Sequence, residues 1–134
     1  MANKKENNPV LAPVNVIWKG ILLIPISGTI DSKRAQGIME TILNKIMETK
    51  SKSIIMDVLG VTTVDSAVAN HLIKITKATK LLGARCIVSG IVPEIAQIIV
   101  ALGVDLGEVD TRADIADALE LAFEVAGLEV VKRK

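Results

Sequence analysis

Five side chains of this 134-residue sequence stand out as candidates for a reaction or a modification: Asp57, Asp65, Ser66, His71 and Cys86. A serine with a carboxylate and a histidine is the composition of a hydrolytic site. An aspartate near the end of a buried strand is also where receiver-type phosphotransfer domains accept a phosphoryl group. One interpretation is therefore a small α/β phosphotransfer or hydrolase-like enzyme that uses Asp57, Ser66 and His71.

Several features argue against an enzyme. A receiver site needs an acidic pair after the first strand to bind Mg²⁺ and a lysine after the last strand, and the sequence has neither near Ile24 or Val109. His71 is expected to be structural or at the surface, and Cys86 is expected to be a buried small hydrophobe. One cysteine and one histidine cannot supply a four-ligand zinc site, and no glycine-rich phosphate-binding motif occurs. We therefore predict no catalytic residue, no metal and no cofactor.

Ser66 lies where a long helical pattern begins, after Thr62, Thr63, Val64 and Asp65. A helix N-terminus offers unpaired N–H groups and a positive dipole end, so it favours a nearby anion such as a phosphate formed on Ser66. The plainer alternative is that Asp65 or Ser66 only caps the helix. The position alone leaves both possibilities open.

Composition limits the functional class. Hydrophobic residues make up 50% of the chain, and sixteen basic residues nearly balance fifteen acidic ones, so a packed domain is expected and binding to nucleic acid is not. Trp18 and Phe123 are the only aromatic residues, which leaves little for base stacking. No apolar run reaches the roughly 20 residues of a membrane helix. Together with the single cysteine, these features predict a cytoplasmic protein without membrane or nucleic-acid partners.

Apolar periodicity predicts one α/β domain with a mixed sheet covered by about four helices. The domain is expected over 10–127, between a polar leader at 1–9 and a basic tail at 128–134. The last helix is expected to begin with a capping box formed by Thr111 and Asp114. In chain order, the expected elements are strands at 14–18 and 21–24, a helix at 32–48, a strand at 53–58, a helix from about 64 to 83, a strand at 85–89, a helix at 93–102, a short strand at 108–109 and a helix at 112–126.

Charge is unevenly distributed along the chain. Residues 1–85 carry twelve basic and six acidic side chains, whereas residues 86–131 carry nine acidic and one basic. These charges can be the solvated faces of separate helices. Alternatively, the basic part of one subunit meets the acidic part of another and steers assembly.

The chain resembles the STAS domain of anti-sigma factor antagonists over the string Ile-Ile-Met-Asp-Val-Leu-Gly-Val-Thr-Thr-Val-Asp-Ser at 54–66 and the following Ala-Val-Ala-Asn-His-Leu. Residues 81–86 and 90–97 are similar to the stressosome branch, the RsbR and RsbS type. The resemblance implies a signalling scaffold whose Ser66 is phosphorylated by a serine/threonine switch kinase of the RsbT type. It also implies assembly with paralogous STAS subunits. We expect Asp57, Thr63, Asp65 and Asn70 to support the site or kinase recognition.

The sequence departs from the RsbR pattern at two points. Ile98 stands where RsbR-type proteins often have a second phosphorylatable threonine. Only the short polar leader precedes the domain, where RsbR-type proteins carry a sensor domain. The sequence therefore leaves open an RsbS-like scaffold subunit or the STAS half of an RsbR-type subunit. A STAS module of an anion transporter is disfavoured because the chain has no membrane segment.

Overall fold

The computed structural model describes residues 13–63, 65–103 and 109–134, so the whole of the predicted leader at 1–9 lies outside the described part. It contains a five-stranded sheet in the order β1-β2-β3-β4-β5. β1 pairs antiparallel with β2, and the other neighbours are parallel, which confirms the mixed sheet. The strands are β1 (Asn15–Trp18), β2 (Ile21–Gly28), β3 (Ser53–Val61), β4 (Arg85–Ser89) and β5 (Asp110–Arg112). The helices described are α2 (Ser32–Thr49), α3 (Ser66–Leu81), α4 (Pro93–Ala101) and α5 (Ile115–Val125).

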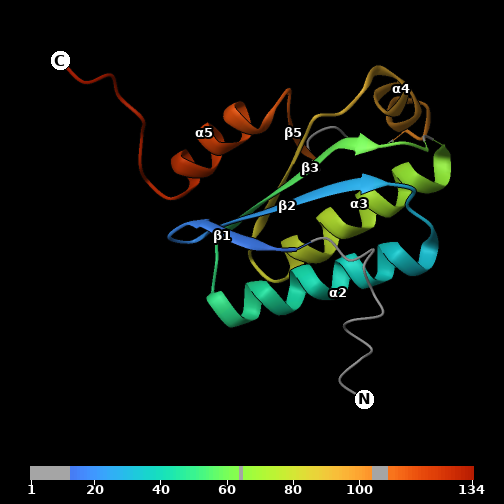
Figure 1. The fold of residues 1–134 in the computed structure, drawn as a ribbon, viewed down its shortest axis with the longest axis horizontal. Helices are drawn as coiled ribbons and strands as arrows, with labels where there is room; N and C mark the ends of the chain where they lie inside the picture. Colours follow the sequence, from blue (N-terminus) through green and yellow to red (C-terminus); the bar gives the residue numbers. More distant parts are fainter. Residues whose placement is uncertain (1–12, 64, 104–108) are drawn as a thin grey trace.

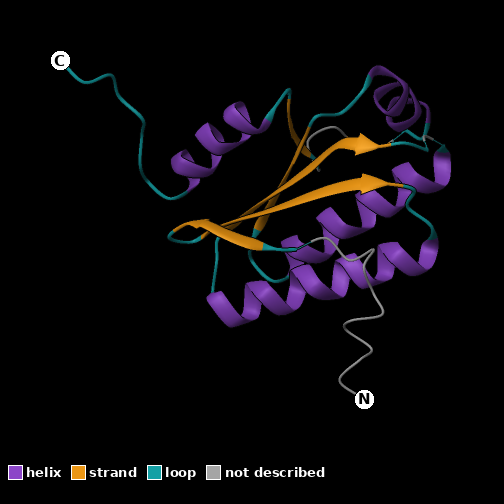
Figure 2. Cartoon of the chain, viewed as in Figure 1, coloured by secondary structure: helices purple, strands orange, loops and turns teal. Residues whose placement is uncertain are grey.

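Helices cover both faces of the sheet (Figures 1 and 2). α2 and α3 pack against one face and α5 packs against the other. β3 is the central strand, and its apolar residues do not alternate with polar ones because both of its faces are covered. Ile54, Met56 and Val58 face α2 and α3, whereas Ile55 faces α5, and all four are fully buried. The predicted buried central strand is therefore confirmed.

Parallel pairing brings the carboxyl ends of β2 and β3 to the same edge of the sheet. The amide of Thr62 donates to the carbonyl of Gly28 at 2.9 Å, which joins the two loops that follow these strands. Gly60 allows the strands to approach closely, because a Cβ atom there would lie 2.8 Å from the Cβ of Ser27. The starts of α2 and α3 are therefore held next to each other.

The C-terminal part differs from the sequence prediction. The last strand is Asp110–Arg112, whereas we expected it at 108–109; of these two residues only Val109 is described, and it precedes the strand. Thr111 pairs with Val88 in the sheet and therefore does not cap a helix. The N-cap of α5 is Asp114, whose Oδ1 accepts from the amide of Asp117 at 2.8 Å. The predicted capping box is wrong, and α5 begins at Ile115 because the residues before it form β5.

A bidentate ion pair joins β4 to the edge strand β5. The guanidinium of Arg85 donates to both carboxylate oxygens of Asp110 at 2.9 Å. The hydrogen bond from Arg85 lowers the pKa of the Asp110 carboxyl below its usual value. This pair stabilises the pairing of the three-residue strand β5, which makes few ladder hydrogen bonds of its own.

A substitution of Gly90 can test how closely the chain packs at the carboxyl end of β4. Its φ is +75°, and a Cβ atom there would lie 2.8 Å from both the Asp57 Oδ1 and the Leu59 Cβ. Gly83 has a similar φ of +81° but has no such neighbours, so it is a matched control. Gly83→Ala should lower the free energy of unfolding by about 1 to 2 kcal/mol through backbone strain alone. Gly90→Ala should cost about 1 to 3 kcal/mol more, because it adds overpacking. Equal losses in urea unfolding would contradict the close approach.

Candidate functional site

Asp65 ends the loop after β3 and caps α3. Its backbone is extended, with φ −151° and ψ −179°, and its Oδ1 accepts a hydrogen bond from the amide of Val68 at 2.9 Å. Of the two residues considered as N-cap, Asp65 therefore has this role. Ser66 is the first residue of the helix, and its side chain is exposed. The predicted acceptor hydroxyl is thus available to a partner at a helix N-terminus.

The loop before Asp65 is attached to the start of α2. The hydroxyl of Thr63 lies 3.4 Å from the hydroxyl of Thr29, and both residues are exposed. On the α2 side, the guanidinium of Arg34 donates to the carbonyls of Ser27 and Thr29, the latter at 2.8 Å. The two helix N-termini therefore lie beside each other, and their dipoles favour a negative group at this edge of the sheet.

α2 and α3 begin with the same dipeptide. Asp31 caps α2 by accepting from the amide of Arg34 at 2.7 Å, and the exposed Ser32 follows it. Asp65 and Ser66 repeat this arrangement at α3. The Asp-Ser pair at 31–32 was not singled out from the sequence as a repeat of the pair at 65–66. Ser32 is consequently an internal comparison for Ser66, because each is the first residue of a helix and directly follows a capping aspartate.

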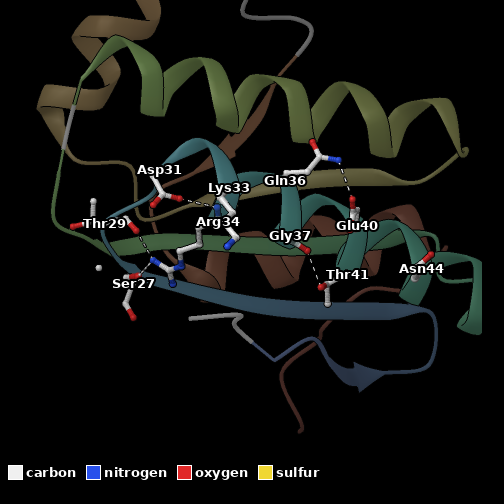
Figure 3. A pocket seen from close by; sticks show the side chains of 11 residues that line it. Ser27, Thr29, Asp31, Lys33, Arg34, Gln36, Gly37, Glu40, Thr41 and Asn44 are labelled. Atoms are coloured by element: carbon white, nitrogen blue, oxygen red, sulfur yellow. Dashed lines mark hydrogen bonds between the residues drawn. The ribbon is translucent and has the colours of Figure 1, made fainter. Parts of the chain in front are cut away.

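An open groove of about 890 Å³ runs along α2 (Figure 3). It is lined by the loop after β2 and by polar side chains of α2, including Gln36 and Glu40, which hydrogen-bond to each other at 3.1 Å. Ser66 is not among its lining residues. The exposed serine therefore lies on an accessible edge of the molecule and not in this groove. Such a position suits a protein partner better than a small substrate.

Asp57 lies on β3 with its side chain on the opposite side of the strand from Met56 and Val58, which face α3. Its Oδ1 accepts a hydrogen bond from the buried hydroxyl of Ser89 on β4 at 2.8 Å. Gly90 follows directly and leaves the space that the carboxylate occupies. The hydrogen bond between Asp57 and Ser89 therefore joins β3 to β4. The sequence did not predict Ser89 as the partner of Asp57.

The other predicted residues of α3 lie beyond its first turn. Asn70 is exposed four residues after Ser66, and therefore on the same side of the helix. His71 is half-buried and lines a cavity of about 180 Å³ between α2 and α3, together with Lys74. Asp57, Ser66 and His71 thus have different surroundings, and the structure does not bring them together as an enzyme site would require.

Cys86 is buried within β4, as predicted for a structural cysteine. Desolvation raises the pKa of its thiol to about 12, so the thiolate is scarce at neutral pH. Within the described residues, no group of three or more histidine, cysteine or acidic side chains is arranged to hold a metal ion. In the same part of the chain, no helix is long and apolar enough to cross a membrane.

Comparison with known proteins identifies the family. The sequence model of the STAS domain matches residues 12–118, and the chain belongs to this family. It is 40% identical over 120 residues to the RsbT co-antagonist protein RsbRA of Bacillus subtilis, which covers 90% of this chain and 44% of that protein. It is 42% identical over 118 residues to RsbRD of the same organism, with 88% and 42% covered. The chain therefore spans less than half the length of these curated relatives.

Solved structures confirm the fold. RsbS of Moorella thermoacetica superposes with a TM-score of 0.75 at 24% identity, over 87% of this chain and 98% of that one. The unphosphorylated anti-sigma factor antagonist SpoIIAA has a TM-score of 0.67 at 16% identity, over 90% and 99% of the two chains. The predicted α/β class and the resemblance to the RsbR and RsbS branch are therefore confirmed.

The cap of α3 can be tested by substitution. Asp65→Ala removes the acceptor of the Val68 amide and should lower the free energy of unfolding by about 1 kcal/mol. Asp65→Asn keeps a capping oxygen and should cost only a small part of that. Urea denaturation of the two variants measures the difference. Equal losses would show that the carboxylate charge, and not the hydrogen bond, stabilises the start of α3.

Proposed function

We propose that this chain is a non-enzymatic signalling scaffold of a stressosome-like complex that binds a serine/threonine switch kinase of the RsbT type and releases it when Ser66 is phosphorylated. The observation that carries the proposal is the exposed Ser66 at the N-terminus of α3, directly after its cap Asp65. The 40% identity to RsbRA, a protein named as an RsbT co-antagonist, supports the class of partner.

Phosphorylation at this position has a physical consequence for binding. A phosphate adds about −1.5 to −2 charges at neutral pH. It can be accepted in the free domain, because the N-terminus of α3 is positive and solvent surrounds Ser66. At an interface the same group must be desolvated next to the Asp65 carboxylate, which disfavours a bound partner. The phosphate thus weakens kinase binding without a change of fold.

The neighbouring residues have separate proposed roles. Thr63 and Asn70 are exposed on either side of the acceptor along the chain and are placed to contact the kinase. Asp65 orients the start of α3, and its charge contributes to recognition. Asp57 acts indirectly, since its hydrogen bond with Ser89 fixes the strand that precedes the loop.

The assembly partners are proposed to be paralogous STAS subunits in the cytoplasm. One structural relative, a subunit of the stressosome described as a signal integration and transduction hub, has a TM-score of 0.67 over 85% of this chain. An enzymatic role is not supported, because Asp57, Ser66 and His71 do not converge. Cofactors and metals have no part in the proposed mechanism.

Phosphorylation by the cognate kinase and ATP tests the acceptor. Ser66→Ala should abolish phosphate incorporation, whereas Ser32→Ala should leave it unchanged, because the kinase must distinguish two serines with equivalent caps. Asp65→Asn should lower the rate if the charge contributes to recognition. Intact mass and peptide mapping measure the incorporation. Phosphate on Ser32, Thr62, Thr63 or Ser89 in a chain whose Ser66 is unmodified would contradict the assignment.

A further inference from the structure

One exposed side of α3 is a basic ridge formed by Lys74, Lys77 and Lys80, and Lys74 also lines the cavity between α2 and α3 described above. These side chains are exposed and spaced by three residues, so they lie along one side of the helix. α3 contains no acidic residue. Leu81 lies on the same side and is 88% exposed, an unusual position for a large apolar side chain at the end of a charged ridge. We call these four residues the basic ridge.

The outer face of α5 is an acidic ridge formed by Asp117, Glu120 and Glu124. All three are exposed and follow one another at intervals of three and four residues. α5 contains no basic residue. The acidic ridge extends over about 10 Å and the three lysines of the basic ridge over about 9 Å, at 1.5 Å per residue. The two ridges therefore match in length and are opposite in charge.

The fold places these ridges on opposite sides of the molecule. The buried side of α3 packs into the cluster that includes Leu72 and Ile75, whereas the buried side of α5 packs around Leu121 against the other face of the sheet. Figure 1 shows the sheet between the two helices. Within one copy the two ridges therefore lie on opposite faces of the sheet, and only their ends, Lys80 and Glu124, lie within electrostatic range of the Arg85–Asp110 pair. α2, in contrast, carries both signs, including a contact between Lys45 and Glu48.

We propose that the basic ridge of one copy docks on the acidic ridge of a second copy, so that subunits associate head to tail. This inference rests on the assembling role proposed above and adds the surfaces through which copies meet. The surfaces differ, so the contact is heterologous, and repetition produces a ring or an open chain of subunits. Leu81 adds apolar contact to the charged one. Opposite charge on the two ridges steers the encounter and sets its orientation.

The experiment is a charge swap in the full chain. The first variant carries Lys74→Glu and Lys80→Glu, so both of its ridges are acidic. The second carries Glu120→Lys and Glu124→Lys, so both of its ridges are basic. Lys19→Glu with Lys52→Glu is the control for the first variant, because it makes the same change in net charge at two exposed lysines that belong to neither ridge. Sedimentation velocity measures association of each protein over a concentration series at low and high salt.

Each swapped variant alone should associate at least about tenfold more weakly than the wild type, whereas the control should not. An equimolar mixture of the two variants should regain wild-type association, because each acidic ridge then meets a basic one. Wild-type association should also weaken gradually as salt rises, since the charges are exposed and screened. Circular dichroism verifies folding, and Lys→Gln and Glu→Gln versions replace any variant that fails to fold.

Three outcomes would overturn the inference: a wild type that stays monomeric up to its solubility limit, swapped variants that associate normally, or a mixture that does not recover. Kinase capture by the same proteins is measured in parallel. Loss of capture by the α3 variant with normal self-association would assign the basic ridge to the kinase and also contradict the proposal. If the swapped variants capture the kinase and self-associate normally, the ridge contact is rejected but the proposed scaffold function is not.

Discussion

The parallel pairing of β2 with β3 is the constraint on which the site depends. It brings the two loops after these strands to one edge, where the Thr62 amide bonds to the Gly28 carbonyl. Because β3 is buried on both faces, its position along β2 cannot shift without exposing Met56 or Val58. The start of α3, and with it Ser66, therefore has a fixed place next to the start of α2.

The capped helix N-terminus does not by itself distinguish the proposed acceptor Ser66 from Ser32. Ser32 and Ser66 both follow a capping aspartate at the first position of a helix. Their surroundings differ in charge: Ser32 precedes Lys33 and Arg34, whereas the first charged residue of α3 is Lys74, after two helical turns. A kinase that discriminates between them must use contacts beyond the cap. The exposed surface around Thr63 and Asn70 is where such contacts are available.

The sequence predicted the features that depend on local patterns. The continuous apolar run at 53–58 predicted a strand covered on both faces, and the 3.6-residue period predicted α2 and α3 nearly to their ends. The position of α5 was harder to predict, because Thr111 looks like a cap but is used in β5, and that pairing depends on β4 more than twenty residues earlier. The bond of Asp57 to Ser89 was likewise invisible, since the two residues lie on separate strands.

The uneven distribution of charge along the chain is a second case in which the sequence could not predict a feature that depends on the fold. The sequence revealed an excess of basic residues before Cys86 and of acidic residues after it, but it could not place them on surfaces. The sheet assigns the lysines of α3 to one side and the carboxylates of α5 to the other. The surfaces proposed for assembly and for phosphorylation are thus different parts of one small domain. Ser66 lies at the beginning of α3, about 12 Å along the helix from Lys74.

The central claim is that a phosphate on Ser66 controls kinase binding. The most direct measurement is the dissociation constant between the assembled chain and an RsbT-type kinase, determined by calorimetry before and after stoichiometric phosphorylation of Ser66. The account predicts that binding weakens at least about tenfold on phosphorylation, while the circular dichroism spectrum stays the same. Equal affinity of the phosphorylated and unphosphorylated chains would contradict it.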